Sequence, residues 1–368
     1  MEERLYWLAW QWIMPGSAKQ IYALADHFGS LRNAWAAKER ELTGLPGIGA
    51  EKLAGIVRHR AETTPESLAE KLRKLNIQFL CFKDAGYPRQ LKNIFDPPAV
   101  LFLRGKTSPD DELAVAVVGA RKPTPYGQIV AEKLAKDLAA VGVTVVSGMA
   151  RGIDTSAHKG ALSAGGRTLA VLGCGLDVVY PRENKKLMEQ IAETGAVLSE
   201  FPPGSAPEAW HFPARNRVIS GLSLGTVVVE AGEKSGALIT ANFALEQGRD
   251  VMAVPGNVTG SLSRGPHRLI KQGARLVEGA GDIIDELGLE RLFPLPEKDE
   301  RPALKISKEE EILYRLLTLE PVSLETIIIK SGLTPQKVMA ALMYLELKGL
   351  TRQLPGKSYI RTGPDPGS

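Results

Sequence analysis

The feature that most constrains the fold is a regular alternation of apolar runs and helical patterns between Leu113 and Val254. The apolar runs are short and do not alternate strictly with polar residues, as expected of strands buried on both faces. They are predicted at Ala114–Val118, Val143–Val146, Leu169–Leu172, Ala196–Ser199, Thr226–Val229 and Val251–Val254. Helical patterns fill most of the gaps, at Gln128–Ala140, Thr155–Ala164, Lys185–Thr194 and Ile239–Gln247. The alternation predicts an extended Rossmann-like α/β domain with a doubly wound, mainly parallel sheet.

The chain has 368 residues, which is more than one hydrophobic core usually supports. We expect a helical domain over 1–76, the sheet domain over 77–293 and a winged-helix domain over 304–361. A polar, proline-rich linker is predicted at 294–303 and a disordered tail at 362–368. Strands at Gln78–Phe82 and Val100–Leu103 are predicted to lead into the sheet.

Composition narrows the classes of function. No apolar run approaches the roughly 20 residues that a membrane span needs, so a cytoplasmic protein without membrane contact is expected. The two cysteines lie far apart in the sequence and give neither a disulfide framework nor a metal pattern. The net charge of +4 permits a nucleic-acid partner without requiring one.

The N-terminal region is predicted to form short helices. Within it, Leu42–Leu53 has the pattern of a helix-hairpin-helix (SAM-like) motif with a Gly47-Ile48-Gly49 turn. Such a turn can offer backbone N–H groups to a DNA phosphate, and it can equally serve as a packing unit. Both interpretations stay open on the sequence.

The C-terminal region is predicted to form a winged helix. Ser323 and Thr334 are suitable N-caps for the two helices of a helix-turn-helix, and Leu350–Ile360 supplies a β-wing. The presumed recognition helix is mostly apolar, with few residues suited to reading DNA. Docking to a protein is therefore at least as well supported as binding to duplex DNA.

The octet Ser147–Asp154, which reads Ser-Gly-Met-Ala-Arg-Gly-Ile-Asp, joins a predicted strand to a predicted helix. A strand that breaks at glycine before a helix aims free backbone N–H groups at phosphate. Gly148 and Gly152 allow an anion to approach the backbone closely, and Arg151 adds a permanent charge. A plain strand-to-helix turn is the alternative.

In doubly wound sheets, ligands bind at the carboxyl ends of the strands. Separate loops at those ends supply cations, with aromatic side chains between them: Arg121, Arg151, Lys185, Arg215 and Arg217, interleaved with Tyr126, Trp210 and Phe212. Cations beside aromatic rings suit single-stranded nucleic acid, because phosphates need charge and unstacked bases need flat apolar faces. A generally polar rim is the weaker interpretation, since several independent loops each contribute a cation.

The same edge shows no catalytic set. No phosphate-binding Walker A loop or dinucleotide fingerprint occurs, and the five histidines lack metal-ligand spacing. Glu230, at the end of an apolar strand, is the one obvious candidate for a catalytic carboxylate. The sequence therefore predicts neither a metal nor a cofactor.

Taken together, the motifs at the strand ends resemble the DprA/Smf family of DNA-processing proteins. The resemblance covers residues 80–287 in detail, and the flanking domains fit longer members. The matching segments are Tyr87-Pro88…Leu91, Pro98…Leu101, Val118-Gly119-Ala120-Arg121…Tyr126-Gly127, the octet Ser147–Asp154, Gly175-Leu-Asp…Tyr180-Pro181…Asn184, Phe212-Pro213…Arg215-Asn216-Arg217…Ile219-Ser220, Glu230-Ala231…Ser235-Gly236…Thr240, Pro255-Gly256 and Gly265…Leu269…Gly273-Ala274.

The resemblance implies a binding protein rather than an enzyme. Members of the family bind single-stranded DNA with little sequence preference, protect incoming DNA, and load RecA recombinase in natural transformation (competence). They form homodimers through the Rossmann-like domain. Carried onto this chain, the resemblance implies a DNA-binding set made of Arg121, Lys122, Ser147, Gly148, Arg151, Asn184, Lys185, Lys186, Arg215, Asn216 and Arg217.

Within this implied set, Arg121 and Lys185 would hold backbone phosphates, with Lys186 equally well placed by sequence. Ser147, Gly148 and Arg151 would shape the anion-binding loop. Residues 215–217 would extend the track along the edge.

Two other functions are kept as alternatives. A nucleotide-processing enzyme similar to the LOG-like phosphoribohydrolases would use Glu230, but the double glycine of that group's Pro-Gly-Gly-x-Gly-Thr-x-x-Glu loop is missing from Gly221–Glu230. A sequence-specific regulator acting through the winged helix is the third possibility. It predicts a preference for one duplex sequence over others.

Overall fold

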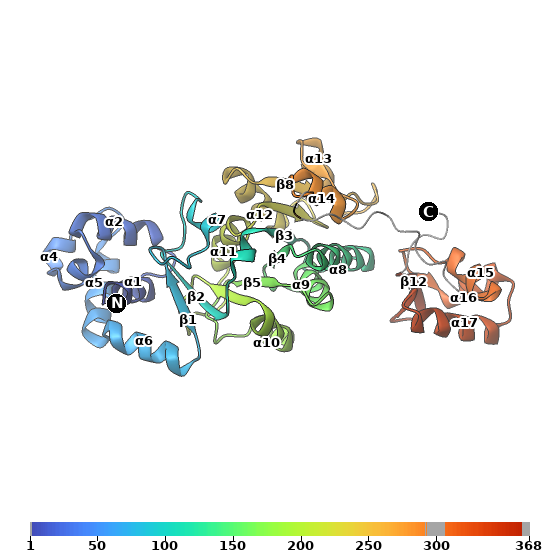
Figure 1. The fold of residues 1–368 in the computed structure, drawn as a ribbon, viewed down its shortest axis with the longest axis horizontal. Helices are drawn as coiled ribbons and strands as arrows, with labels where there is room; N and C mark the ends of the chain where they lie inside the picture. Colours follow the sequence, from blue (N-terminus) through green and yellow to red (C-terminus); the bar gives the residue numbers. More distant parts are fainter. Residues whose placement is uncertain (1, 291, 293–305, 363–368) are drawn as a thin grey trace. The chain divides into compact units, whose positions relative to one another are not determined.

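The computed structural model describes residues 2–290, 292 and 306–362, which divide into two compact units. The larger contains the N-terminal helices and the sheet. The smaller consists mainly of the C-terminal residues from 306 onward (Figure 1) and also includes residues 123–130. The predicted linker at 294–303 lies outside the described residues, as does the predicted tail apart from Thr362. Among the described residues, no helix has the length and apolar composition that a membrane crossing requires.

The larger unit is built on one sheet, whose strand order among the described residues is β1-β2-β6-β5-β4-β3-β7-β8-β9. Neighbouring strands are parallel from β6 through β9, whereas β2 pairs antiparallel with both β1 and β6. The strands are β1 (Gln78–Cys81), β2 (Val100–Gly105), β3 (Ala114–Val118), β4 (Thr144–Ser147), β5 (Thr168–Leu172), β6 (Ala196–Ser199), β7 (Gly225–Val228), β8 (Asp250–Ala253) and β9 (Arg275–Leu276).

The predicted doubly wound, mainly parallel sheet is confirmed, with strand bounds within one or two residues of those expected. Helices connect the strands as predicted at α8 (Pro125–Ala140), α9 (Ile153–Ser163), α10 (Lys185–Thr194) and α12 (Gly236–Glu246). The sequence did not predict strand β9, the helices α7 (Arg89–Lys92), α11 (His211–Gly221), α13 (Arg264–Lys271) and α14 (Ala280–Glu286), or the 3₁₀ turns η1 (Pro109–Glu112) and η2 (Arg182–Asn184).

The central strands β3 to β7 are almost entirely buried because helices cover both faces of the sheet. On one face, Ala170, Leu172 and Val197 pack with α10 and with the N-terminal helices. On the other face, Leu169 and Val171 pack with α7, α11, α12 and α13. Successive residues of β5 thus point into different cores, which is why its sequence lacks a polar alternation.

The N-terminal helices share the first of these cores. They are α1 (Glu2–Ile13), α2 (Ala18–Phe28), α3 (Leu31–Ala36), α4 (Glu39–Leu42), α5 (Ala50–Glu62) and α6 (Pro65–Lys74). Trp7 and Trp10 of α1 are buried, and the ring of Trp12 meets Phe102 of β2 edge-on with centroids 6.2 Å apart. The helical region and the sheet therefore pack as one body, and the expected domain boundary at 76/77 stays a prediction.

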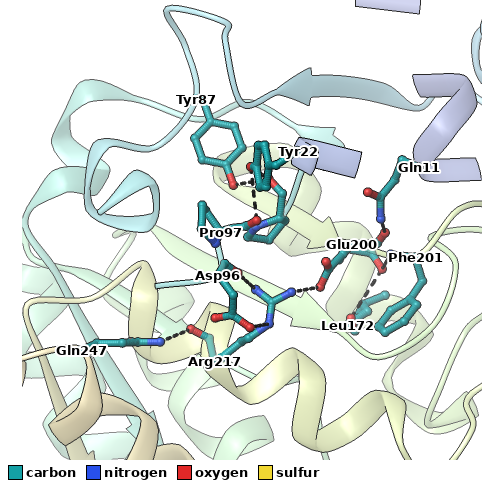
Figure 2. A network of polar contacts seen from close by, with 12 residues as sticks. Gln11, Tyr22, Tyr87, Asp96, Pro97, Leu172, Glu200, Phe201, Arg217 and Gln247 are labelled. Carbon is teal, nitrogen blue, oxygen red and sulfur yellow. Dashed lines mark hydrogen bonds and ion pairs between the residues drawn. The ribbon is translucent and has the colours of Figure 1, made fainter. Parts of the chain in front are cut away.

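A buried polar network joins the helical region to the sheet (Figure 2). Arg217 of α11, 6% exposed, donates to a carboxylate oxygen of Glu200 at 2.5 Å and to the carbonyl oxygen of Asp96 at 2.7 Å. Its Nε lies 3.3 Å from the Asp96 carboxylate, and Gln11 of α1 donates to the carbonyl oxygen of Glu200 at 2.8 Å. Burial raises the pKa of Glu200, while the Arg217 guanidinium acts in the opposite direction. One arginine thus neutralises a carboxylate that is almost wholly removed from water.

The contact between α8 and α9 is so close that only glycine fits at position 160. A Cβ added to Gly160 would lie 2.1 Å from the backbone oxygen of Glu132. Glycine-to-alanine changes inside helices normally stabilise by about 0.5–1 kcal/mol. We expect Gly160→Ala to destabilise by about 1–3 kcal/mol instead, because the two helices must separate. Urea unfolding is the measurement.

Gly55→Ala in α5 is the matched control for this prediction, since a Cβ there meets no atom within 4 Å. It should leave the free energy of unfolding unchanged or raise it slightly. Equal effects of the two substitutions would contradict the close α8–α9 contact.

The smaller unit is a winged helix, as predicted. Its helices are α15 (Lys308–Leu316), α16 (Leu324–Ser331) and α17 (Pro335–Leu347), and its sheet is β10 (Val322–Ser323), β12 (Ser358–Arg361) and β11 (Thr351–Leu354). The side chains of Ser323 and Thr334 cap α16 and α17 as expected. Helix α17, the second helix of the helix-turn-helix, exposes Met339, Met343 and Leu347.

Candidate nucleic-acid interface

The winding direction of the sheet reverses between β3 and β7. From β3 the chain proceeds through β4 and β5 to β6 in one direction, and from β7 through β8 to β9 in the other. Loops leaving two adjacent strands in opposite directions open a crevice at their carboxyl ends, where ligands of such folds bind. A cavity of about 740 Å³ lies there, lined by residues of the β3–α8 loop, α11 and the β7–α12 loop.

The β3–α8 loop presents two exposed cations to this edge. Arg121 and Lys122 follow β3 and form no ion pair within the described residues. The Arg121 guanidinium carbon lies 5.0 Å from the ring centroid of Phe212, and the Tyr180 ring lies 5.7 Å from that of Phe212. A cation and two aromatic rings from two loops and the start of α11 therefore meet at one place.

The loop after β4 is held in its shape by buried side chains. Met149 has a left-handed φ of 58° and Gly152 one of 76°. Ser147 donates to the carbonyl oxygen of Val117 at 2.7 Å, and Asn184 donates to that of Met149 at 3.0 Å. Ser147 and Asn184 are both buried, so they organise the backbone of the predicted anion loop rather than project from it.

The other exposed cations of the predicted set come from this loop and from the start of α10. Arg151 is exposed and forms a two-bond ion pair with Glu183, which raises the pKa of Arg151 and lowers that of Glu183. Lys185 and Lys186 are exposed and have no ion-pair partner in the part of the chain that the structure describes. Both lysines are therefore available to an anionic ligand.

Arg215 lies beneath the loop and is 5% exposed. Its guanidinium donates to the carbonyl oxygens of Gly148 and Val171, at the ends of β4 and β5. A Cβ on Gly148 would lie 2.7 Å from the Asp154 carboxylate and 2.8 Å from the Arg215 guanidinium, so only glycine fits above this pair. Burial raises the pKa of Asp154 to about 6, although Arg215 acts to lower it.

The predicted set thus separates into two groups with different roles. The first group is exposed at the edge: Arg121, Lys122, Arg151, Lys185 and Lys186. The second group is buried and bonded internally, and it comprises Ser147, Asn184, Arg215, Asn216 and Arg217. Gly148, also buried, contributes backbone to the loop. Residues 215–217 are almost fully buried in α11, and Arg215 and Asn216 also line the cavity at the switch point. That these residues extend the track along the edge stays a prediction.

Other residues at the edge were not among the predicted site residues. Lys234, in the β7–α12 loop, is exposed and lines the switch-point cavity with Ser235 and Gly236. Its position in the sequence Glu233-Lys234-Ser235-Gly236, directly before a helix and after a strand, could have indicated that Lys234 lies at this edge. Glu230 is 5% exposed. Within the described residues, no group of His, Cys, Asp and Glu side chains could hold a metal ion.

The sequence of this chain matches the models of one protein family. Residues 78–288 match the family model of DNA recombination-mediator protein A, and residues 296–357 match that of the DprA winged helix domain. The chain is 37% identical to Protein Smf of Synechocystis sp., over 98% of this chain and 99% of that protein. It is 46% identical to DNA processing protein DprA of Bacillus subtilis, over 58% of this chain and 73% of that protein.

Solved structures agree with these matches. The X-ray structure of DNA processing protein A (DprA) from Streptococcus pneumoniae superposes with a TM-score of 0.66 at 36% identity, covering 76% of this chain and 97% of that one. A structure of DNA processing protein A from Helicobacter pylori, described for its single-stranded DNA binding mode, gives a TM-score of 0.52 at 32% identity, covering 57% of this chain and 95% of that one. The predicted resemblance is confirmed, and the chain belongs to the DprA/Smf family of DNA-processing proteins.

Proposed function

We propose that this protein binds single-stranded DNA along the carboxyl edge of its sheet, through phosphate contacts and without catalysis. The observation that carries the proposal is the exposed group Arg121, Lys122, Arg151, Lys185 and Lys186, which three separate segments bring to this one edge. The name of the Helicobacter pylori structure, which specifies single-stranded DNA binding, supports the same ligand here.

The physical argument favours a single strand over a duplex. Exposed cations neutralise phosphates and release their counterions, which provides affinity without sequence preference. Phe212 and Tyr180 lie beside Arg121 and can stack on bases, but only on bases that a partner strand does not already cover. Cations and rings within a few ångströms of one another therefore suit an unpaired strand.

The arrangement of the acidic groups favours binding over catalysis. Glu230 is almost fully buried, and Asp154 faces Arg215 beneath the loop. A carboxylate that is to act as general base must reach the reacting atom of a substrate. Release of a base from a nucleoside monophosphate, tested with wild type and Glu230→Gln, would separate the LOG-like alternative from the binding function.

Membership of the family supports three further parts of the proposal. The protein would protect incoming strands and load RecA recombinase onto them during natural transformation. It would act as a homodimer through the Rossmann-like domain, and it would work in the cytoplasm. Crosslinking of the full chain and RecA-filament assays on coated single strands are the tests of these parts.

The central test compares wild type with Arg121→Ala and Lys185→Ala. We expect each substitution to weaken binding of an oligothymidylate roughly tenfold to a hundredfold, because each removes a charge-assisted hydrogen bond to phosphate. The slope of log affinity against log salt should fall by about 0.7 for each phosphate that the variant no longer neutralises. Fluorescence anisotropy over a series of salt concentrations measures both quantities.

Lys271→Ala is the matched control, since Lys271 is exposed on α13 and does not line the cavity at the switch point. It should bind like wild type. Wild-type affinity in both Arg121→Ala and Lys185→Ala would refute the proposed edge, and the helix-hairpin-helix and the winged helix would become the sites to test.

A further inference from the structure

Three lysines without acidic partners lie where the N-terminal helices meet the entry to the sheet. Lys19 lies on α2, and Lys83 and Lys92 lie in the connection between β1 and β2. All three are exposed, and none of them forms an ion pair among the residues that the structure describes. Ammonium groups without partners are suited to an anionic ligand.

Contacts with aromatic rings place the three ammonium groups on one surface. Each nitrogen lies over a ring centroid, at 4.2 Å for Lys19 and Phe95, 5.6 Å for Lys83 and Trp7, and 4.9 Å for Lys92 and Phe82. The rings of Trp7 and Phe82 both contact Tyr22 of α2, with centroids 5.7 and 5.1 Å apart. Tyr22 follows Lys19 by three residues, so both lie on one side of that helix. We call Lys19, Lys83, Lys92 and Phe95 the junction patch.

The acids of the β1–β2 connection are neutralised by arginines from other parts of the chain. This connection contains two acids, Asp84 and Asp96. Arg4 of α1 lies 2.8 Å from the Asp84 carboxylate, and Arg217 of α11 lies 3.3 Å from that of Asp96. A contact with a ring does not remove the charge of an ammonium group. The junction patch therefore keeps its positive charges for a partner.

Phe95 adds a flat apolar surface on a loop that is held in place. Its side chain is 87% exposed. The carbonyl oxygen of Asp96 accepts from Arg217 at 2.7 Å, and that of Pro97 accepts from the Tyr22 hydroxyl at 3.3 Å (Figure 2). Lysines beside an exposed aromatic ring form the combination on which single-stranded nucleic acid binds, with phosphates at the charges and bases on the ring.

Helix α11 links the junction patch to the candidate interface. It has Phe212 near its start and reaches Arg217 five residues later, roughly 7–8 Å along its axis at about 1.5 Å per residue. Arg217 donates to the carbonyl oxygen of Asp96, which directly follows Phe95. The patch therefore lies close to the rings and cations of the interface.

Trp210 joins the start of α2 to the start of α11. It is half-exposed and directly precedes α11. A Cβ on Gly16 would lie 3.2 Å from its ring, and Lys19 follows Gly16 by three residues. The part of α2 that carries a lysine of the patch thus adjoins the first residues of α11.

We propose that the junction patch is a second contact for the bound single strand, in which its lysines bind phosphates and Phe95 stacks on a base. The patch rests on the proposed function, because the strand is the one that also lies along the carboxyl edge of the sheet. A polynucleotide offers a flat base beside each phosphate, whereas a run of acidic residues offers only the charge. The exposed ring among the lysines therefore favours a nucleic acid over an acidic protein segment.

The first test removes charge and depends on the length of the strand. Single-strand sites span about 4–16 nucleotides, so an oligothymidylate of about 6 nucleotides fills the edge and one of about 20 also reaches the patch. The double variant Lys19→Ala with Lys92→Ala should weaken binding of the long probe roughly tenfold to a hundredfold and lower its salt slope by about 1.4, for two lost phosphate contacts. Binding of the short probe should not change. Lys271→Ala, the exposed lysine on α13, is the control and should change neither probe.

The second test changes the ring and keeps every cation. Phe95→Leu should weaken binding of the long probe roughly fivefold to a hundredfold, because leucine is apolar but gives a base no flat surface. Phe95→Trp keeps such a surface and should bind at least as tightly as wild type. Leu245→Ala is the control, since Leu245 is an exposed side chain at the end of α12.

Both probes, and polyglutamate as an acidic peptide, are titrated into wild type and each variant. Loss of long-probe affinity in the lysine variant and in Phe95→Leu, with short-probe affinity unchanged, supports the patch. Wild-type binding of the long probe by both variants overturns it, and so does an equal loss for both probes. Polyglutamate binding that the lysine variant loses, while the long probe keeps its affinity, overturns it in favour of an acidic protein segment.

These outcomes are distinguishable from failure of the proposed function. If Arg121→Ala and Lys185→Ala lose single-strand binding while the patch variants keep it, only the patch is wrong. If the patch variants lose the long probe while Arg121→Ala and Lys185→Ala bind like wild type, the proposed edge is wrong and the patch is supported. If wild type binds neither probe, the proposed function and the patch are both wrong.

Discussion

Replacing Arg217 by methionine is expected to lower the free energy of unfolding by about 3–5 kcal/mol. The cost arises because Glu200, 1% exposed, would remain buried without its neutralising partner, and the carbonyl oxygen of Asp96 would lose its donor (Figure 2). Methionine keeps much of the side-chain volume, so the loss reports charge and hydrogen bonds rather than a cavity. Chemical unfolding of the full chain at neutral pH measures it.

Two controls isolate this cause. Arg264→Met breaks an exposed ion pair with Glu233, and it should cost less than about 1 kcal/mol. Adding Glu200→Gln to Arg217→Met removes the unpaired charge and should restore a large part of the lost stability. If Arg217→Met unfolded at the same denaturant concentration as Arg264→Met, the network would not contribute to stability as argued.

Much of the fold could be predicted because its strands obey a simple rule. Val145 and Val171 are buried residues of parallel strands that helices cover on both faces. Continuous apolar runs separated by helical patterns indicate such strands. The antiparallel pairing of β2 with β6 could not be predicted in this way, because an apolar strand has the same composition in either direction. Helix α11 was missed for a different reason. Its sequence, His-Phe-Pro-Ala-Arg-Asn-Arg, has no apolar periodicity at its start.

The exposed residues of the candidate site could be predicted from the sequence, whereas the burial of others could not. Arg121 and Lys185 follow from the rule that parallel strands present their carboxyl ends at one edge. Arg215 and Arg217 look the same in sequence, because arginine is usually exposed. Their burial depends on partners distant in the chain, namely the carbonyl oxygens of Gly148 and Val171 and the carboxylate of Glu200. No local pattern carries that information.

Arg215 and Asp154, two buried charged groups on either side of the Cβ position of Gly148, give the second large effect, and its size depends on pH. Arg215→Met should lower the free energy of unfolding by about 3–5 kcal/mol at pH 8, because ionising the buried Asp154 carboxyl would then be offset mainly by backbone N–H groups such as that of Ala150. At pH 5 the loss should shrink to about 1–3 kcal/mol, the cost of leaving the carbonyl oxygens of Gly148 and Val171 without their donor. Unfolding of both proteins at a series of pH values measures the difference.

The sign follows from the pKa of Asp154, which burial raises from 3.8 to about 6 in the folded protein. A raised carboxyl pKa means that the folded state binds more protons than the unfolded state between about pH 4 and 6, so stability falls as pH rises through that window. Removing Arg215 raises the folded pKa further and extends the fall to higher pH. The double variant Arg215→Met with Asp154→Asn should therefore lose the pH dependence that Asp154 causes. It should keep the pH-independent loss of stability that comes from the carbonyl oxygens of Gly148 and Val171. A deficit in Arg215→Met that stayed equal from pH 5 to pH 8 would show that the two charges do not interact beneath the anion loop.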